Sequence, residues 1–252
     1  MKTTIDILNK EFSAQNFSHE PAYGSMASEF IDMAANYARI ENAIAVLSDL
    51  RTNISHIFYG GFAHVFGLGK DLKEGIVHSI WEKEIFNRIH PDDLAGKHLQ
   101  ELCFYHFVKR QPGKKRSDYY LMSKLRMKTA TGSYIPVLHR MFYIYSASHE
   151  TLCLALCLYT PLTIDFPSKC IIVDSSDGHT IEPKKQNNED ILSAREKQIL
   201  GFIDKGLTSK DIAELLCISI NTVSRHRQGI LGKLQVKNSI EACRIAKDLR
   251  II

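Results

Sequence analysis

The stretch from residue 191 to residue 246 constrains the fold more than any other part of the chain, because one pattern occurs in it four times. Each occurrence begins with a residue that can cap a helix N-terminus, followed three positions later by a polar partner. The pairs are Ser193 with Glu196, Thr208 with Asp211, Ser219 with Thr222, and Asn238 with Glu241. The two pairs that end in Glu are the stronger capping boxes. Apolar residues at helical spacing follow each start, so the pattern predicts four short helices.

The junction between the second and third of these helices is short. Gly206 is suited to end the first helix in the left-handed conformation. Only Cys217 and Ile218 separate the second helix from the cap of the third at Ser219. This spacing is typical of a helix-turn-helix.

The charge of the third helix indicates what it contacts. No acidic residue lies between Glu214 and Glu241. Within the same interval lie the basic residues Arg225, Arg227, Lys233 and Lys237, together with His226. An acid-free helix with short polar side chains near its N-terminus suits insertion between the phosphate-lined walls of a DNA groove. A four-helix unit that merely has a basic face is the less favoured interpretation.

This stretch resembles the LuxR-type (GerE-like) helix-turn-helix of bacterial transcription regulators. The residues that carry the resemblance are Leu192, Ser193, Arg195 and Glu196, then 206–213, then Ile218, Ser219, Asn221, Thr222, Val223 and His226, and finally Lys233, Leu234, Val236, Lys237 and Asn238. The resemblance implies that residues 191–252 form an all-α, four-helix DNA-binding domain.

By position, the resemblance implies that Ser224, Arg225 and Gln228 touch base edges, while Lys210 and others lie near the phosphate backbone. The full set of candidate DNA-binding residues is Lys210, Thr222, Val223, Ser224, Arg225, His226, Arg227, Gln228 and Lys233. Ser224 stands where many members of the family carry Lys. Since Ser can bond to several bases, the preferred operator does not follow by analogy.

Residues 43–162 show patterns typical of β-strands at both ends and patterns typical of helices between them. Strands are expected at 43–50, 53–59, 119–128, 135–145 and 151–160, and 90–93 opens a helix. The order of these elements resembles that of a PAS domain. The local sequence also resembles that family, at residues 45–49, 58–59, 62–67 and 89–93. The resemblance implies an α+β domain, a five-stranded antiparallel sheet with helices, that senses a ligand or mediates dimerisation.

Two further segments flank the PAS-like domain. Residues 1–42 form an N-terminal segment whose helix, capped by Ser25 or Ser28, continues to Ile40 and covers either a neighbouring domain or a partner's copy of itself. Residues 163–190 form a linker with a β-hairpin over 169–182, followed by a polar flexible link.

The sequence names no cofactor for the PAS-like domain. Cys103 does not lie in the Asn-Cys-Arg motif of a flavin photosensor. His98 and His106 lie on a semi-apolar helix, where a histidine is more typical of a structural residue than of a haem ligand. A pocket for an acyl-homoserine lactone would use several aromatic residues where only Trp81 is present. The strand order also disfavours a phosphoreceiver domain. No metal site is expected.

Composition excludes several other classes of protein. A hydrophobic fraction of 44% argues against extensive disorder, and a net charge of +4 is too small to establish nucleic-acid binding alone. Six cysteines without a paired framework suit a reducing cytosol. The longest apolar run, 152–159, is too short to span a membrane. We therefore expect a cytoplasmic protein with no membrane partner.

Motifs for catalysis are absent. Gly67, Gly69 and Lys70 lack phosphate-loop spacing, and His149-Glu150 lacks the second His of a zinc protease. We expect no enzyme, but a sequence-specific regulator that binds double-stranded DNA as a homodimer, with a small-molecule ligand left open. The alternative is a PAS-based protein-interaction or scaffolding module without specific DNA readout.

Overall fold

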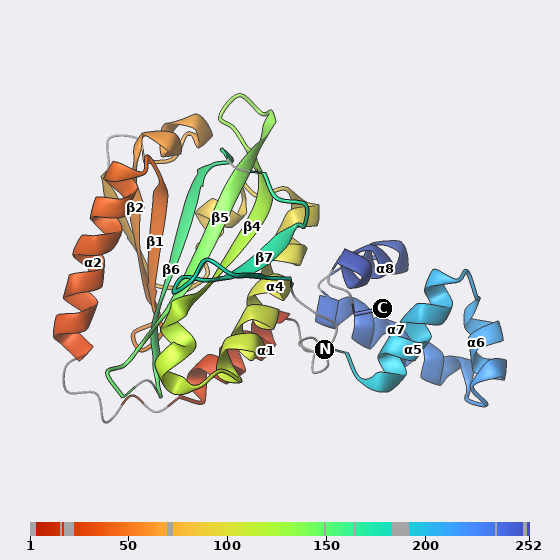
Figure 1. The fold of residues 1–252 in the computed structure, drawn as a ribbon. Coiled ribbons are helices and arrows are strands. Elements are labelled where there is room, and N and C mark those ends of the chain that lie inside the picture. Colours follow the sequence, from red (N-terminus) through yellow and green to blue (C-terminus); the bar gives the residue numbers. More distant parts are fainter. Residues whose placement is uncertain are drawn as a thin grey trace. The chain divides into compact units, whose positions relative to one another are not determined.

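A computed structural model shows how the chain folds (Figure 1). It describes residues 4–15, 17, 23–69, 73–148, 150–163, 165–182, 192–234, 236–248 and 251–252. The chain divides into two compact units. The sheet unit contains Glu11–Leu94 and Val108–Glu182, and the helical unit contains Met1–Lys10, Ala95–Phe107 and Pro183–Ile252.

Among the described residues, eight strands form one antiparallel sheet in the order β3-β2-β1-β6-β5-β4-β7-β8. They are β1 (Ile44–Asp49), β2 (Ile54–Tyr59), β3 (Glu74–Val77), β4 (Tyr119–Lys128), β5 (Tyr134–Tyr145), β6 (Leu152–Pro161), β7 (Cys170–Asp174) and β8 (Thr180–Ile181). The five predicted strands are β1, β2, β4, β5 and β6, which are neighbours in the sheet. The predicted α+β fold with an antiparallel sheet is confirmed.

Three strands extend the sheet beyond the predicted five. The strand β3, which was not predicted, is four residues long, contains Gly75 and pairs with the edge of β2. The hairpin expected in the linker is present as β7 and β8, and β7 also pairs with β4, with Ile172 opposite Leu121. The hairpin is therefore part of the sheet. The expected flexible link, 184–190, lies outside the described residues.

Successive side chains of each strand point to opposite faces of the sheet, and both faces are apolar. On one face Val46 and Ile57 pack with Phe62 and Phe66 of the 3-10 helix η1 (Gly61–Phe66). The other face packs against α2 (Tyr23–Ile40), which lies along it (Figure 1). This helix starts at Tyr23, ahead of both predicted caps.

A tertiary contact explains the early start of α2. The Tyr23 hydroxyl donates a hydrogen bond to Asp49 at the end of β1, and the Tyr23 ring is buried. The guanidinium of Arg51 lies over this ring at 4.8 Å from its centroid. These partners are distant in sequence, so local capping rules did not reveal them.

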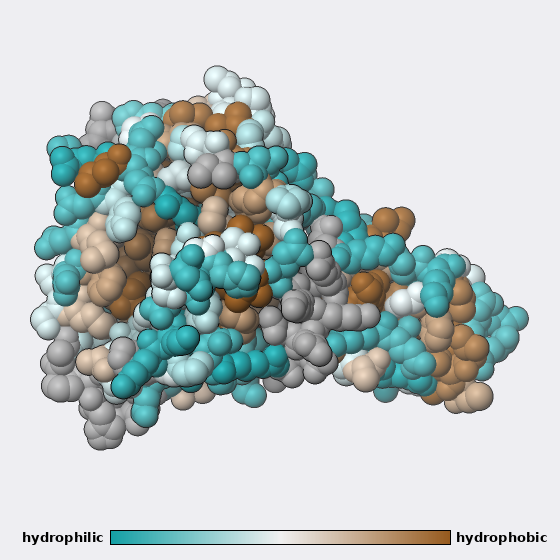
Figure 2. All heavy atoms as spheres, in the orientation of Figure 1, coloured by the Kyte–Doolittle hydropathy of each residue, from teal (hydrophilic) through white to brown (hydrophobic). Residues whose placement is uncertain are grey.

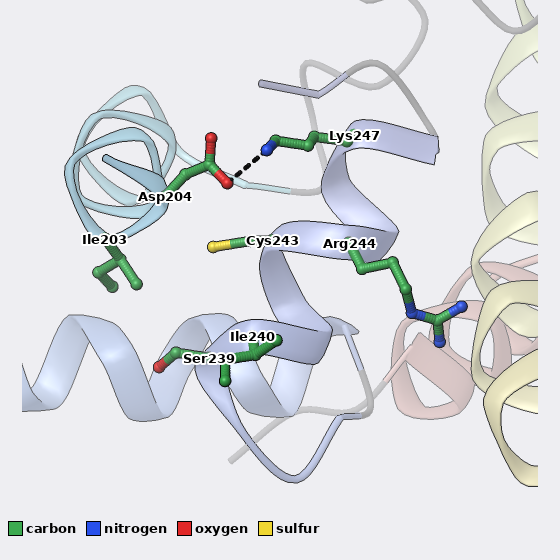
Figure 3. A pocket seen from close by; sticks show the side chains of 7 residues that line it. All are labelled: Ile203, Asp204, Ser239, Ile240, Cys243, Arg244 and Lys247. Carbon is green, nitrogen blue, oxygen red and sulfur yellow. Dashed lines mark ion pairs between the residues drawn. The ribbon is translucent and has the colours of Figure 1, made fainter. Parts of the chain in front are cut away.

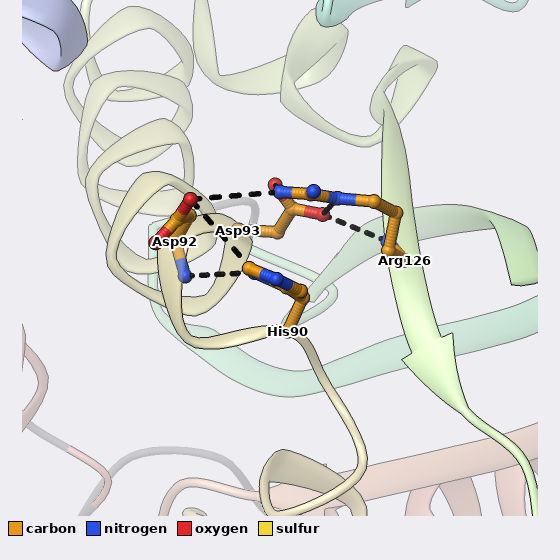
Figure 4. Close-up of polar contacts among 4 residues, drawn as sticks. All are labelled: His90, Asp92, Asp93 and Arg126. Atoms are coloured by element: carbon orange, nitrogen blue, oxygen red, sulfur yellow. Dashed lines mark hydrogen bonds and ion pairs between the residues drawn. The ribbon is translucent and has the colours of Figure 1, made fainter. Parts of the chain in front are cut away.

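The helices α3 (Lys83–Phe86) and α4 (Pro91–Lys109) and the 3-10 helix η2 (Gly113–Asp118) lie between β3 and β4 in sequence. The start of α4 is held by its own first residues and by β4 (Figure 4). His90 Nδ1 accepts the Asp92 N–H at 3.2 Å, as suits a helix-start residue. Asp93 accepts from Arg126 through Nε and Nη2, each at 2.8 Å.

The carboxylate of Asp93 is more acidic than usual. Burial raises the pKa of Asp93, but hydrogen bonds from the side chain and backbone of Arg126, together with its charge, more than compensate and place the pKa below its ordinary range. Asp93 is therefore ionised at neutral pH and binds the first turn of α4 to β4.

The N-terminal helix α1 (Thr4–Ser13) was not predicted, because its sequence is largely polar. Asp6 in its first turn and Lys10 in its last suit the helix dipole. Thr4 and Leu8 are fully buried, and the Thr4 hydroxyl donates to the backbone carbonyl of Lys233. Residues 4–10 belong to the helical unit. None of the helices in the described part of the chain is long and apolar enough to cross a membrane.

Candidate nucleic-acid interface

The four helices predicted at the C-terminal end are all present. They are α5 (Ala194–Asp204), α6 (Ser209–Leu215), α7 (Ile220–Leu234) and α8 (Ser239–Asp248). Ser193 and Glu196 exchange both bonds of a capping box, with the Ser193 N–H 2.7 Å from Glu196 Oε2. Thr208 and Asp211 also form a complete box, although a weaker one was expected.

The other two helix starts differ slightly from the expected pattern. Ser219 Oγ accepts the Thr222 N–H at 3.1 Å at the start of α7. Asn238 Oδ1 accepts the Glu241 N–H at 2.9 Å at the start of α8. Glu241 accepts a backbone N–H from Lys237 rather than from Asn238. Each cap satisfies backbone groups that would otherwise lack partners at the helix N-terminus.

The angle between α6 and α7 is set by the turn and by the core. Cys217 adopts a left-handed backbone with φ of 50°, and the Ile218 N–H bonds back to the Ala213 carbonyl at 3.0 Å. Beneath the turn lies a core of buried side chains: Leu192, Ile199, Leu200, Ile212, Val223, Ile230, Leu234, Ala242, Ile245 and Ala246. Gly206 has φ of 85°, which confirms the predicted left-handed end of α5.

This core corrects one predicted site residue. Val223 was included among the DNA-binding candidates, but its side chain is 0% exposed. A side chain buried to this degree cannot reach a base edge without unfolding the domain. Val223 is therefore a packing residue that orients α7 rather than a contact residue.

The side of α7 opposite Val223, Ile230 and Leu234 faces solvent. Arg225 and Gln228 are exposed on it. Ser224, Thr222 and His226 are partly buried, and Lys210 on α6 is exposed. Of the three residues that were expected to touch base edges, Arg225 and Gln228 are thus exposed and Ser224 is partly buried.

Three of the remaining candidates are bound within the domain. Arg227 donates to Ser209 Oγ at 2.7 Å and to Ser239 Oγ at 3.0 Å, which joins α7 to α6 and α8. Lys233 Nζ lies 2.6 Å from Glu196 Oε2. The Thr222 hydroxyl lies 2.9 Å from Ser219 Oγ in the helix cap. These contacts position α7 on its scaffold.

The ion pair at Glu196 also changes its acidity. Burial raises the pKa of this carboxyl, but hydrogen bonds from Lys233 and Ser193 more than offset that effect, so the pKa lies below its ordinary range. The Glu196 side chain is only 8% exposed. It remains charged at neutral pH and holds α5 and α7 together.

The structure points to one further candidate contact residue, Asn221, which the sequence indicated only as part of the helix-turn-helix motif. Asn221 is exposed in the first turn of α7. It lies four positions before Arg225 and seven before Gln228, and residues at this spacing share one face of a helix. That spacing, applied outward from Arg225, would have found it.

A cleft of 430 Å³ lies between α5 and α8 (Figure 3). The Cys243 side chain points toward α5, and Lys247 forms an ion pair with Asp204 at 2.7 Å. Arg244 extends away from that pair, and Ile240 at the start of α8 is 85% exposed. The residues that line the cleft come from α5 and α8, so the cleft is separate from the polar face of α7.

Four capped helices, a tight turn and an exposed polar face on the helix after the turn define a helix-turn-helix domain. Residues 190–246 match the family of bacterial regulatory proteins described as GerE, the luxR family. This segment is therefore a LuxR-type helix-turn-helix domain. That family is a class of regulatory proteins and not a class of enzymes.

Similar proteins include the oxygen regulatory protein NreC of Staphylococcus haemolyticus, which is 40% identical over 78 residues, covering 31% of this chain and 34% of the relative. The oxygen regulatory protein NreC of Staphylococcus aureus (strain JH9) is 35% identical over 95 residues, covering 38% of this chain and 40% of the relative. The chain thus spans well under half the length of these curated relatives.

Two solved structures are similar over longer stretches. The VqmA–DPO complex of a phage is 15% identical at a TM-score of 0.32, covering 90% of this chain and 91% of that one. The PAS domain of a Colwellia psychrerythraea protein is 15% identical at a TM-score of 0.34, covering 53% and 98%. At these TM-scores, neither likeness carries a conclusion about this chain.

Proposed function

We propose that this protein is a sequence-specific transcriptional regulator that inserts α7 into the major groove of double-stranded DNA. The observation that carries the proposal is the solvent-facing polar side of α7 within a LuxR-type domain. Arg225 and Gln228 are exposed there, and the interval from Glu214 to Glu241 contains no acid to repel phosphates.

Each contact has a separate role in this proposal. The Arg225 guanidinium can donate two parallel hydrogen bonds to guanine, and the Gln228 amide can pair with adenine. Ser224 bonds to several bases and refines the choice. Lys210, exposed at the start of α6, contacts phosphate and fixes the register of the domain on the duplex, together with groups such as His226.

The helix caps make this surface rigid before DNA arrives. Ser219 holds the first turn of α7, and Arg227 and Lys233 bind its remaining length to α5, α6 and α8. A pre-ordered helix loses little conformational entropy on binding, so the contact energy appears as affinity and specificity.

We also propose that two copies act together through α2. Its residues Met33, Tyr37 and Ile40 are 37%, 39% and 73% exposed, and they are spaced three or four positions apart. Met33 and Tyr37, together with Phe30, border an apolar groove whose other side is formed by Phe142, Ile144 and Leu156 of the sheet. Figure 2 shows apolar side chains gathered along this helix and the neighbouring strands.

Exposed apolar residues at this spacing are typical of a helix that packs against another helix. A second copy of α2 would cover the stripe. Two copies would present two α7 helices to half-sites about 10 base pairs apart. The sheet unit then sets the dimer, and a small-molecule ligand in this unit would act by changing the dimer. Native mass spectrometry of the purified protein tests for such a ligand.

The central experiment is selection from a randomised duplex library, followed by a mobility shift at several salt concentrations. We expect one duplex family to be enriched and its affinity to fall steeply as salt rises, because phosphate contacts release counterions. If no duplex is enriched, or if binding is independent of salt, the protein is instead an interaction module without specific DNA readout.

A further inference from the structure

We infer that Asn221 is a specificity-determining residue that reads an A·T base pair at the end of the half-site nearest the N-terminus of α7. This inference rests on the proposed function of α7. It adds a base contact beyond those expected at Ser224, Arg225 and Gln228.

The first support is that the side chain of Asn221 is available. Among the described residues, the side chains of Asn221, Arg225 and Gln228 make no hydrogen bond to another group, and all three are exposed. Neighbouring polar residues of α7 differ in this respect. Thr222 is part of the cap with Ser219, and Arg227 bonds to two serines.

The second support is the position of Asn221 on the helix. Four and then three residues separate Asn221, Arg225 and Gln228, so the three side chains project from one face at axial intervals of about 6 Å and about 4.5 Å. Successive bases of one strand are about 3.4 Å apart. The three residues therefore span about three base-pair steps, and Asn221 stands in the first turn, the part of a recognition helix that lies closest to base edges.

The third support is chemical. The amide of Asn presents an acceptor and a donor side by side, which match the N6 donor and the N7 acceptor of adenine. Arg225 in the middle of the row matches guanine. The predicted half-site therefore has a G·C pair near its centre and an A·T pair toward the N-terminal end of α7.

A structural role for Asn221 is a poor alternative. The cap of α7 is made by Ser219 and the Thr222 N–H, and neither bond involves the Asn221 amide. Truncating Asn221 therefore leaves the start of the helix satisfied. Asp at the same position is also compatible with the fold, since an acid in the first turn interacts favourably with the helix dipole.

The test uses the full chain and the duplex family that the wild-type protein selects. Asn221→Ala should lose its preference at a single base-pair position, with affinity for the A·T duplex reduced between about fivefold and about a hundredfold. Preferences at the other positions should remain. Asn36→Ala, the same change at an exposed position on α2, is the matched control and should leave every preference intact.

Asn221→Asp provides the sharper result. A carboxylate accepts a hydrogen bond from cytosine N4, so the selected base at that one position should change from adenine to cytosine. If both variants weaken all duplexes equally, Asn221 contacts phosphate and the inference is wrong. Unchanged selection by both variants overturns it as well, while the proposed function of α7 stands. A wild-type protein that selects no duplex overturns both.

Discussion

Arg227 Nη1 lies 2.7 Å from Ser209 Oγ, and its Nη2 lies 3.0 Å from Ser239 Oγ. One guanidinium on α7 thus holds α6 on one side and the start of α8 on the other. Arg225, two residues earlier on the same helix, is exposed. Two arginines that look alike in the sequence therefore have opposite surroundings.

This difference predicts opposite phenotypes for the two arginines. Arg227→Ala should lower the free energy of unfolding of the helical unit by about 2 kcal/mol, because two hydrogen bonds from a charged group are lost. Arg225→Ala should change that free energy by less than about 0.5 kcal/mol but should abolish one base preference. Urea denaturation followed by circular dichroism, with duplex selection alongside, measures both. Equal stability losses would contradict the assignment.

Lys233 provides a second test of whether a basic residue stabilises the domain or contacts DNA. Lys233→Met leaves the Glu196 carboxylate, 8% exposed, without its cation, and should cost about 1–3 kcal/mol of stability. The double variant Lys233→Met, Glu196→Gln should recover part of this loss, since the charge that needs a partner is also removed. A phosphate contact would behave differently, because Lys233→Met would then reduce the salt dependence of DNA binding and leave stability unchanged.

The ion pair also predicts a dependence on pH. The pKa of Glu196 is lowered on folding, so the carboxylate binds fewer protons in the folded chain than in the unfolded one. Its contribution to stability is therefore complete above about pH 5 and is lost as the pH falls through the folded pKa. Urea midpoints of wild type and Glu196→Gln should differ at neutral pH and converge in acid. A constant difference across this range would show that Glu196 does not titrate as proposed.

The sheet unit depends on Asp93 and Arg126. Asp93→Asn should lower the free energy of unfolding of this unit by about 1 kcal/mol, because a bidentate pair is lost but Arg126 is about half exposed to water. Asp92→Asn is the matched control, since Asp92 lies 3.9 Å from Arg126 Nη2 and its side chain is also about half exposed. Fluorescence of Trp81, which packs against the core of the sheet unit, follows the unfolding. Equal effects of the two variants would contradict the role given to Asp93.

The proposed dimer can be tested at the exposed end of α2. Ile40→Asp should raise the dissociation constant at least about tenfold, because burying an isoleucine side chain is worth about 1.5–3 kcal/mol and a charge in its place must be desolvated. Ser28→Asp places the same charge at an exposed position of the same helix that faces away from this stripe, and it should have a much smaller effect. Sedimentation measures both constants. If neither variant dissociates the protein, or if the wild type is a monomer, α2 is not the dimer contact.

Elements that are determined by local interactions could be predicted from the sequence. The starts of α5 to α8 follow from pairs three residues apart, and the strand β4 follows from alternation of Leu121, Leu125 and Met127 with basic residues. Elements that depend on distant partners could not be predicted. The short strand β3 forms because β2 offers an edge, and α2 starts early because of the Tyr23–Asp49 bond.

By itself, the sequence determined that residues 191–246 form a helix-turn-helix and that an α+β domain with an antiparallel sheet precedes it, because caps, turns and hydrophobic periods act between near neighbours. Only the tertiary structure decided which residues of α7 are available for contact. Val223 is enclosed by the core, Arg227 and Lys233 are bound to other helices, and Asn221 faces solvent. The contact between Thr4 and Lys233 likewise joins residues 229 positions apart. Such pairings depend on how distant segments pack, which no local pattern encodes.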